Sequence, residues 1–244
     1  RTRNSSLIEM QSRARASSYA FPQETCREPC CSVGAVSKLV GDERVRAERL
    51  LDAQAKAAQL FDTIERRAMV RAGVGERALS DEIRDLAAEL FGLTEHWHKR
   101  VVRAGVNTLQ PFAENPPDRV IAADDIVFCD FGPIFEQWEA DFGRTFVLGD
   151  DPDKLALRDA LPRVWAAGRD YFDGRPEVTG AELFDHVVAV ARAEGFGWGS
   201  PIAGHLVGQF PHKKIAGDGA QWYVAPGSDQ PMRRPDGSGL ASHW

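Results

Sequence analysis

The stretch Ile126-Val-Phe-Cys-Asp-Phe-Gly-Pro133 decides how this chain folds. Its apolar run ends on the carboxylate of Asp130, which is typical of a buried strand, and the Gly-Pro pair that follows is a turn signal. A second stretch, from Phe135 to Leu148, carries Asp141 in the string EADFGRTF. Two short strands joined by a turn would place the carboxylates of Asp130 and Asp141 side by side.

Two ionised carboxylates in an apolar setting repel each other and are costly to remove from water. A divalent cation between them removes that cost. The segment GHLVGQFPH then supplies two histidines, His205 and His212, among turn residues. Taken singly, each aspartate could be an ordinary turn or cap residue, and each histidine could be a buried, hydrogen-bonded side chain without a metal. Together they predict a metal site, and oxygen ligands with a histidine suit manganese, cobalt, iron or zinc.

Four ordered pieces of the sequence resemble the pita-bread metallopeptidases, which are the methionine aminopeptidases, the proline-specific aminopeptidases and dipeptidases, and creatinase. The pieces are EHWHKRVVRAGVNT with His98, CDFGP with Asp130, EADFGRTF with Asp141, and GHLVGQFPHKK with His205 and His212. The resemblance covers residues 42 to 244 and is greatest to bacterial proline-peptidase-like members. It implies an α+β fold in which helices back a curved antiparallel sheet, with the site in the concave face.

The resemblance also implies a role for each residue. Asp130 would hold one metal, Asp141 would bridge two, and His205 would ligate the other. His212 would stabilise the negative charge that develops at the scissile carbonyl, and His98 would contact the substrate near the scissile nitrogen. The implied function is a metal-dependent peptidase of the aminopeptidase or X-proline type, in which two divalent metal ions activate the water that attacks a peptide bond.

The family completes its site with two glutamates from strands beyond the histidine motif, and no glutamate follows Glu194 in this sequence. The expectation is a domain that is incomplete at its C-terminus, so whether the chain is an enzyme stays open. The alternative is an inactive or truncated member that acts as a non-catalytic binding module. A creatinase-like amidinohydrolase, which works without metal, is disfavoured because Asp130 and Asp141 are both present. Two interpretations of Arg144 stay open: it could orient a carboxylate ligand of the metal, or it could be a solvated charge at the end of a strand.

The composition limits the remaining function classes. A net charge of -6 argues against nucleic-acid binding that rests on charge, and no apolar run reaches the ~20 residues of a membrane span. Four cysteines without a disulfide framework favour a reducing cytoplasm. Cys129 is expected to be a small buried side chain, and the cluster Cys26, Cys30 and Cys31 an incidental one. The expected partner is a peptide substrate, and a homodimer stays open.

The chain is expected to divide into a divergent, disordered extension over residues 1–41 and a catalytic domain over 42–244. Apolar periodicity predicts a helix over 42–72, whose stripe includes Leu51, and Ser80 is a candidate N-cap for a second helix that ends near Gly92. Further helices are predicted from Asp151-Pro152 and from a capping box at Thr179. A strand is expected near Val101-Val102, and short strands and turns from Ile202 onward.

Overall fold

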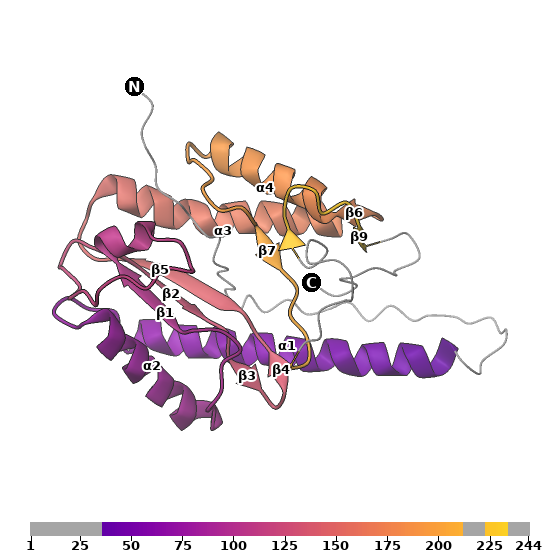
Figure 1. The fold of residues 1–244 in the computed structure, drawn as a ribbon, viewed down its shortest axis with the longest axis horizontal. Coiled ribbons are helices and arrows are strands. Elements are labelled where there is room, and N and C mark those ends of the chain that lie inside the picture. Colours follow the sequence, from indigo (N-terminus) through magenta and orange to yellow (C-terminus); the bar gives the residue numbers. More distant parts are fainter. Residues whose placement is uncertain (1–35, 212–222, 234–244) are drawn as a thin grey trace.

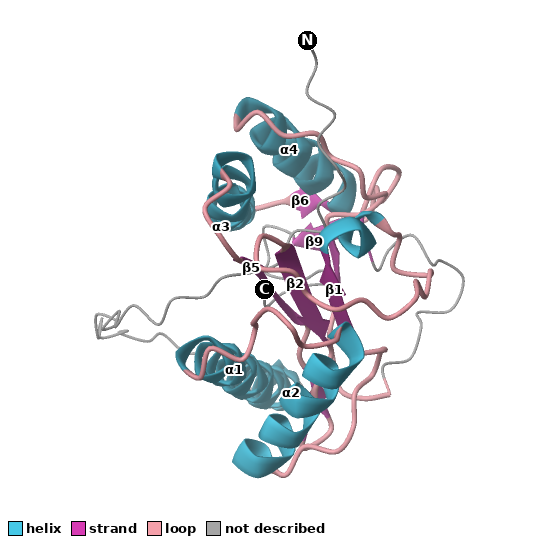
Figure 2. Cartoon of the chain, turned by 90° about the vertical axis from the view of Figure 1, so that its left-hand side faces the viewer, coloured by secondary structure: helices cyan, strands magenta, loops and turns pink. Residues whose placement is uncertain are grey.

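The computed structural model describes residues 36–211 and 223–233 of the chain. The first two helices cover one face of a small antiparallel sheet, and the last two form a separate layer beside it (Figures 1 and 2). The elements, in chain order, are α1 (Val36–Arg66), α2 (Glu76–Phe91), β1 (Val101–Ala104), the 3-10 helix η1 (Gly105–Leu109), β2 (Ile126–Phe131), β3 (Ile134–Phe135), β4 (Trp138–Glu139), β5 (Phe142–Val147), α3 (Pro152–Asp173), β6 (Val178–Thr179), α4 (Gly180–Ala193), β7 (Gly204–His205), β8 (Tyr223–Val224) and β9 (Pro231–Arg233).

The main sheet has the order β1-β2-β5, and both pairs are antiparallel. Burial alternates along β2, so that Val127, Cys129 and Phe131 are buried while Asp130 is only partly buried. The buried side chains join the core formed with α1 and α2, where the rings of Phe61 and Phe131 lie 5.8 Å apart. Because successive strand residues point to opposite faces, Asp130 faces away from α1 and α2.

A second core lies between α3 and α4. It contains Val164 and Phe172 from α3 and Leu183 and Val187 from α4, together with Val178 of β6. Asp151 caps α3 by accepting hydrogen bonds from two backbone N–H groups, and Thr179 and Glu182 form a complete capping box at α4. The described part of the chain therefore has two cores, one between the sheet and the helices α1 and α2, and one between α3 and α4. The strand β7 comes after α4 in the chain.

The predicted α+β class is confirmed, as are the strand at Val101, the helix starts at Pro152 and Thr179, and the buried position of Cys129. Two helix details were wrong. Ser80 is not an N-cap, because α2 begins at Glu76, where the backbone N–H of Glu76 is held by the carbonyl of Arg119. Leu51 is 62% exposed, since α1 packs against the core only from Ala53 onward.

The first helix also ends earlier than predicted, at Arg66, because Ala68 turns into the left-handed region with φ +48°. Residues 36–41 belong to α1, whereas residues 1–35 lie outside the described part. The division of the chain at residue 41 therefore stays a prediction. Within the described ranges, no helix is both long enough and apolar enough to cross a bilayer.

Candidate metal centre

Four of the residues singled out in the sequence converge at one place. His98 precedes β1, Asp130 lies in β2, Asp141 stands immediately before β5, and His205 ends β7. The Nε2 atom of His98 lies 3.8 Å from Oδ1 of Asp130 and 3.6 Å from Oδ1 of Asp141. The Nε2 atom of His205 lies 2.6 Å from Oδ2 of Asp141. We call His98, Asp130, Asp141 and His205 the four-residue cluster.

Both histidines of the cluster have a fixed ring orientation. Nδ1 of His98 lies 2.7 Å from the carbonyl oxygen of Lys99, and Nδ1 of His205 lies 3.1 Å from that of Leu206. A carbonyl oxygen only accepts hydrogen bonds, so each Nδ1 carries the proton. Nε2 of each ring faces the carboxylates: it donates to Asp141 when the ring is protonated, and its lone pair becomes available to a metal only when the ring is neutral. Metal-binding histidines are commonly oriented by a backbone carbonyl in this way.

The cluster shifts the pKa values of its own members. Burial would lower the pKa of His205, but its hydrogen bond to Asp141 and the nearby negative charge raise that pKa to about 9. Burial likewise opposes the charged form of His98, and the two carboxylates raise its pKa nonetheless. Burial would raise the pKa of Asp141, but hydrogen bonds from His205 and His98 hold it below its usual range. Asp141 is therefore ionised at neutral pH.

A glycine and a tryptophan bring His98 into position. A Cβ atom on Gly132 would lie 2.3 Å from Cδ2 of His98 and 2.5 Å from Nε1 of Trp97, so the close approach of these rings requires glycine. The indole of Trp97 donates from Nε1 to the carbonyl of Ala140, and its ring contacts both histidines edge-on, with centroids 4.4 Å from His98 and 5.1 Å from His205. Trp97 stands inside the quoted EHWHKR motif, but its role is visible only in three dimensions.

A second residue that the sequence did not reveal is Glu139 in β4, which is 1% exposed. Its carboxylate accepts a hydrogen bond from the backbone N–H of Gly208, and its own N–H donates to the Gly208 carbonyl. The carbonyl of Gln137 also accepts from the N–H of Phe210. The β3–β4 hairpin thereby fastens the segment that follows His205.

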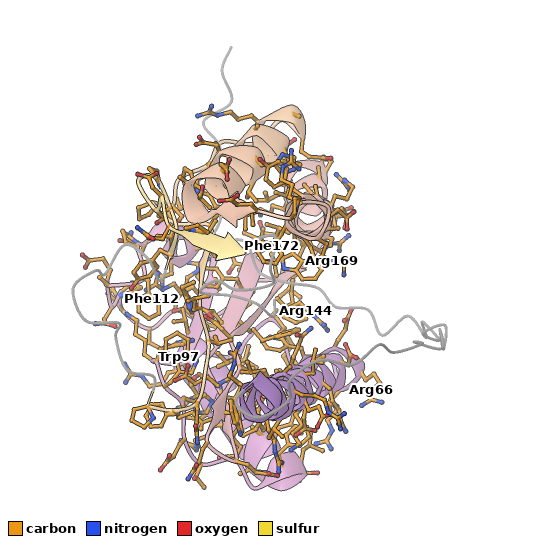
Figure 3. All side chains as sticks on the ribbon, turned by 90° about the vertical axis from the view of Figure 1, so that its right-hand side faces the viewer. Arg66, Trp97, Phe112, Arg144, Arg169 and Phe172 are labelled. Carbon is orange, nitrogen blue, oxygen red and sulfur yellow. The ribbon has the colours of Figure 1, made fainter. Side chains whose placement is uncertain are left out.

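Arg144 takes up neither of the roles predicted for it. Its guanidinium, 4% exposed, donates to Asp62 and Glu65 of α1 and lies over the ring of Phe61. In the view of Figure 3, Arg144 and Arg66 lie on the right of the sheet, whereas Trp97 and Phe112 lie on the left. Since Arg144 is the cross-strand neighbour of Cys129, it points to the face opposite Asp130. It anchors α1 and does not touch the cluster.

Two predictions fall outside the described residues. His212 and the cysteine cluster around Cys30 lie in the ranges 212–222 and 1–35, so their predicted roles stay predictions.

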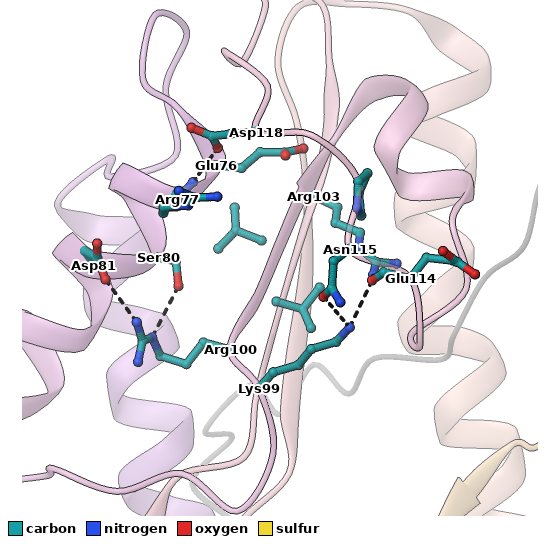
Figure 4. A pocket seen from close by; sticks show the side chains of 13 residues that line it. Glu76, Arg77, Ser80, Asp81, Lys99, Arg100, Arg103, Glu114, Asn115 and Asp118 are labelled. Carbon is teal, nitrogen blue, oxygen red and sulfur yellow. Dashed lines mark hydrogen bonds and ion pairs between the residues drawn. The ribbon is translucent and has the colours of Figure 1, made fainter.

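A groove of about 260 Å³ lies elsewhere, between α2, the outer side of β1 and the loop that follows η1 (Figure 4). The cationic side chains that line it form hydrogen bonds within the protein. Arg100 donates to Ser80 and Asp81, and Lys99 donates to the carbonyl of Glu114. It contains no member of the four-residue cluster. These contacts fasten the loop to the sheet.

The donor set of the cluster suits a divalent cation. One nitrogen of His98 and one oxygen each of Asp130 and Asp141 all lie within 4.8 Å of one another. Two carboxylates and two oriented imidazoles are the ligand types of manganese, iron, cobalt and zinc. The residues therefore fit a metal centre that lies on the sheet face opposite α1.

Several solved structures share the fold of this chain. Among solved structures, an X-Pro aminopeptidase from Thermotoga maritima MSB8 superposes with a TM-score of 0.62 at 20% identity, covering 78% of this chain and 51% of that chain. Dipeptidase PepE from Mycobacterium ulcerans gives 0.58 at 25% identity, covering 81% and 51%. An Xaa-Pro dipeptidase from Bacillus anthracis gives 0.60 at 22% identity, covering 79% and 53%.

The chain thus spans about half the length of these solved structures, and their likeness confirms the predicted pita-bread fold. A comparison with curated proteins finds no match. The sequence profile of metallopeptidase family M24 matches residues 48–234, which is most of the chain and includes every member of the four-residue cluster. This chain therefore belongs to metallopeptidase family M24.

Proposed function

We propose that this chain is the metal-binding part of a peptidase that hydrolyses peptide bonds near the N-terminus of its substrates, including X-Pro bonds. The observation that carries the proposal is the convergence of His98, Asp130, Asp141 and His205 from four separate segments onto one partly buried point. Membership of family M24 supports the reaction class. The X-Pro preference is drawn from the solved structures of an X-Pro aminopeptidase and an Xaa-Pro dipeptidase.

In this proposal Asp130, Asp141 and His205 would hold the divalent metal ions of the site. When bound, the metal would polarise the carbonyl of the scissile peptide bond and lower the pKa of the attacking water. The chain's own residues keep this chemistry in place. The carbonyls of Lys99 and Leu206 fix the two imidazoles, and Trp97 fills the space between the rings. The role of His212, stabilising the carbonyl oxygen as negative charge develops, stays part of the proposal.

The test is hydrolysis of a peptide panel by the purified chain with added Mn²⁺ or Co²⁺. The panel pairs X-Pro peptides with the same peptides carrying alanine in place of proline. We expect metal-dependent release of an N-terminal residue or of dipeptide products, and its loss in His205→Ala. His186→Ala is the matched control, because His186 stacks on Tyr171 in the α3–α4 layer and lies outside the cluster. Hydrolysis that persists unchanged in His205→Ala would refute the assignment of the site.

Two further predictions accompany this proposal. The cysteine content favours a cytoplasmic location, and a homodimer stays open. Sedimentation of the purified chain would measure the oligomeric state directly.

A further inference from the structure

We infer that Phe112 is a specificity-determining residue of the proposed peptidase, and that it favours substrates with a neutral apolar side chain beside the scissile bond. The inference rests on the proposed function, because it concerns the substrate of the same metal centre. Phe112 belongs to the loop that follows η1 and lies outside the four sequence motifs that predicted the centre.

Phe112 borders the metal centre. Its ring meets that of His98 edge-on, with the centroids 5.8 Å apart and the planes at 77°. His98 in turn faces the carboxylates of Asp130 and Asp141. Figure 3 shows Phe112 on the same side of the sheet as Trp97, whose ring contacts both histidines of the cluster. A peptide held at the cluster would therefore bring a side chain within reach of the Phe112 ring.

The ring of Phe112 is available to a ligand. It is 42% exposed and belongs to neither of the two cores that the described residues form. A phenylalanine side chain gains free energy when its large apolar surface is covered. Ligand sites combine such apolar surfaces with a few polar groups that orient the ligand, and here the cluster supplies the polar groups.

The loop that carries Phe112 is fixed by a buried charge. The guanidinium of Arg103, 4% exposed, donates to four backbone carbonyls of this loop, those of Gln110, Pro111, Phe112 and Glu114. Lys99 adds hydrogen bonds to the carbonyl of Glu114 at 2.9 Å and to the side chain of Asn115 at 3.0 Å (Figure 4). The exposed ring is thus held in place before a ligand arrives, which reduces the ordering cost of binding.

The charge beside the ring sets the preference for neutral side chains. The ammonium nitrogen of Lys99 lies over the ring of Phe112, 4.7 Å from its centroid. A cation from the substrate would find this attractive ring face already occupied by a cation and would be repelled by it. An uncharged side chain of the same length does not meet this repulsion.

The deciding experiment uses two series of alanine tripeptides with Mn²⁺. The first or the second residue is alanine, norleucine or lysine, and norleucine has the length of lysine without its charge. Both kcat/KM and the Kd from calorimetry are measured. We expect wild type to prefer norleucine over alanine by about tenfold in at least one series, as for added methylenes in an apolar pocket. Lysine should be disfavoured against norleucine in the same series.

Phe112→Ala should lose most of the norleucine preference, because it removes the apolar surface. Leu109→Ala is the matched control and should keep the preference. Leu109 is 41% exposed at the end of η1, three residues before Phe112. Calorimetric titration of each variant with Mn²⁺ reports separately on the metal centre.

The outcomes separate this inference from the proposed function. If wild type hydrolyses the peptides but shows no norleucine preference, or if Phe112→Ala retains it, the inference is wrong and the proposed peptidase stands. A loss of preference in Leu109→Ala equal to that in Phe112→Ala also overturns the inference. If wild type binds the norleucine peptide preferentially through Phe112 but hydrolyses none, the selectivity assigned to Phe112 holds and the proposed hydrolysis fails. If wild type neither binds nor hydrolyses any peptide, both fail.

Discussion

The Nε2 atom of His205 lies 2.6 Å from Oδ2 of Asp141, while the other oxygen of the same carboxylate faces His98 at 3.6 Å. One side chain thus connects the segment before β1 with β7, which follows the α3–α4 layer. The two oxygens of this carboxylate therefore face different imidazoles. This arrangement makes Asp141 the residue on which the geometry of the centre depends most.

Metal binding should release protons and strengthen as the pH rises from 7 to 9. In the metal-free chain Asp141 raises the pKa of His205 to about 9, so Nε2 of His205 carries a proton at neutral pH. A metal must displace that proton, which makes affinity increase by up to about tenfold per pH unit below the pKa. Calorimetry with Mn²⁺ in buffers of different ionisation enthalpy counts the protons released. An affinity that stays constant from pH 7 to 9 would contradict this expectation.

Asp141→Ala should reduce metal binding more than Asp130→Ala. Both oxygens of Asp141 face imidazole nitrogens, so its removal affects both sides of the centre. Asp130 makes a longer contact within the cluster, from its Oδ1 to Nε2 of His98 at 3.8 Å. Calorimetric titration should show both stoichiometry and affinity falling in Asp141→Ala, and a milder loss in Asp130→Ala. Equal losses in the two variants would argue against a bridging role.

Gly132→Ala should weaken metal binding without removing any ligand. A Cβ atom there would lie 2.3 Å from the ring of His98 and 2.5 Å from that of Trp97, so both rings must move. We expect a loss of about 10–100-fold in Mn²⁺ affinity, similar to the loss of a partner that orients a ligand. Gly75→Ala is the matched control, because its Cβ would meet only the Asp118 carboxylate, at 3.2 Å, far from the cluster in the fold. Equal Mn²⁺ affinities in the two variants would mean that metal binding does not depend on this close approach.

The sequence singled out all four members of the cluster, and the structure brings their side chains together, while their roles stay predictions. Asp130 could be found because it ends an apolar run, and the start of α4 because Thr179 and Glu182 form a capping box. The predicted fold class and helix starts followed from the same kind of signal. What short-range patterns could not supply was the position of His98, which depends on how β1 pairs with β2.

The errors share a physical cause, which is competition from contacts distant in the sequence. Ser80 has the side chain of an N-cap, but the carbonyl of Arg119 captures the N–H of Glu76 and starts α2 one turn earlier. Leu51 was assigned to the apolar stripe of α1, but it is 62% exposed, whereas Ala53 and Ala57 are buried, so it lies outside the face that packs on the core. Arg144 looked like a residue of the site because it is three positions from Asp141, but strand alternation turns it toward α1.

Arg144→Ala should destabilise the fold by about 1–3 kcal/mol, as expected for loss of a buried hydrogen-bonded charge, and leave metal affinity unchanged. The guanidinium donates to Asp62 at 3.0 Å and Glu65 at 3.2 Å, and it is 4% exposed. Arg67→Ala is the control, since Arg67 pairs with Glu89 on the surface and its loss should be hardly measurable. Urea unfolding of both variants gives the comparison. If Arg144→Ala lowers Mn²⁺ affinity while remaining folded, the residue acts on the centre after all.

Glu139→Ala should lower both stability and metal affinity, whereas Glu139→Gln should retain much of each. The carboxylate of Glu139 is buried and accepts the N–H of Gly208, three residues beyond His205. Alanine leaves that N–H without its partner, at a cost of about 1–3 kcal/mol, and releases the segment that carries His205. The glutamine carbonyl oxygen can still accept from Gly208. Thermal unfolding and Mn²⁺ titration are therefore measured on both variants. If Glu139→Ala unfolds more easily but binds Mn²⁺ as wild type does, Glu139 supports the fold alone, and His205 is positioned by β7 without the hairpin.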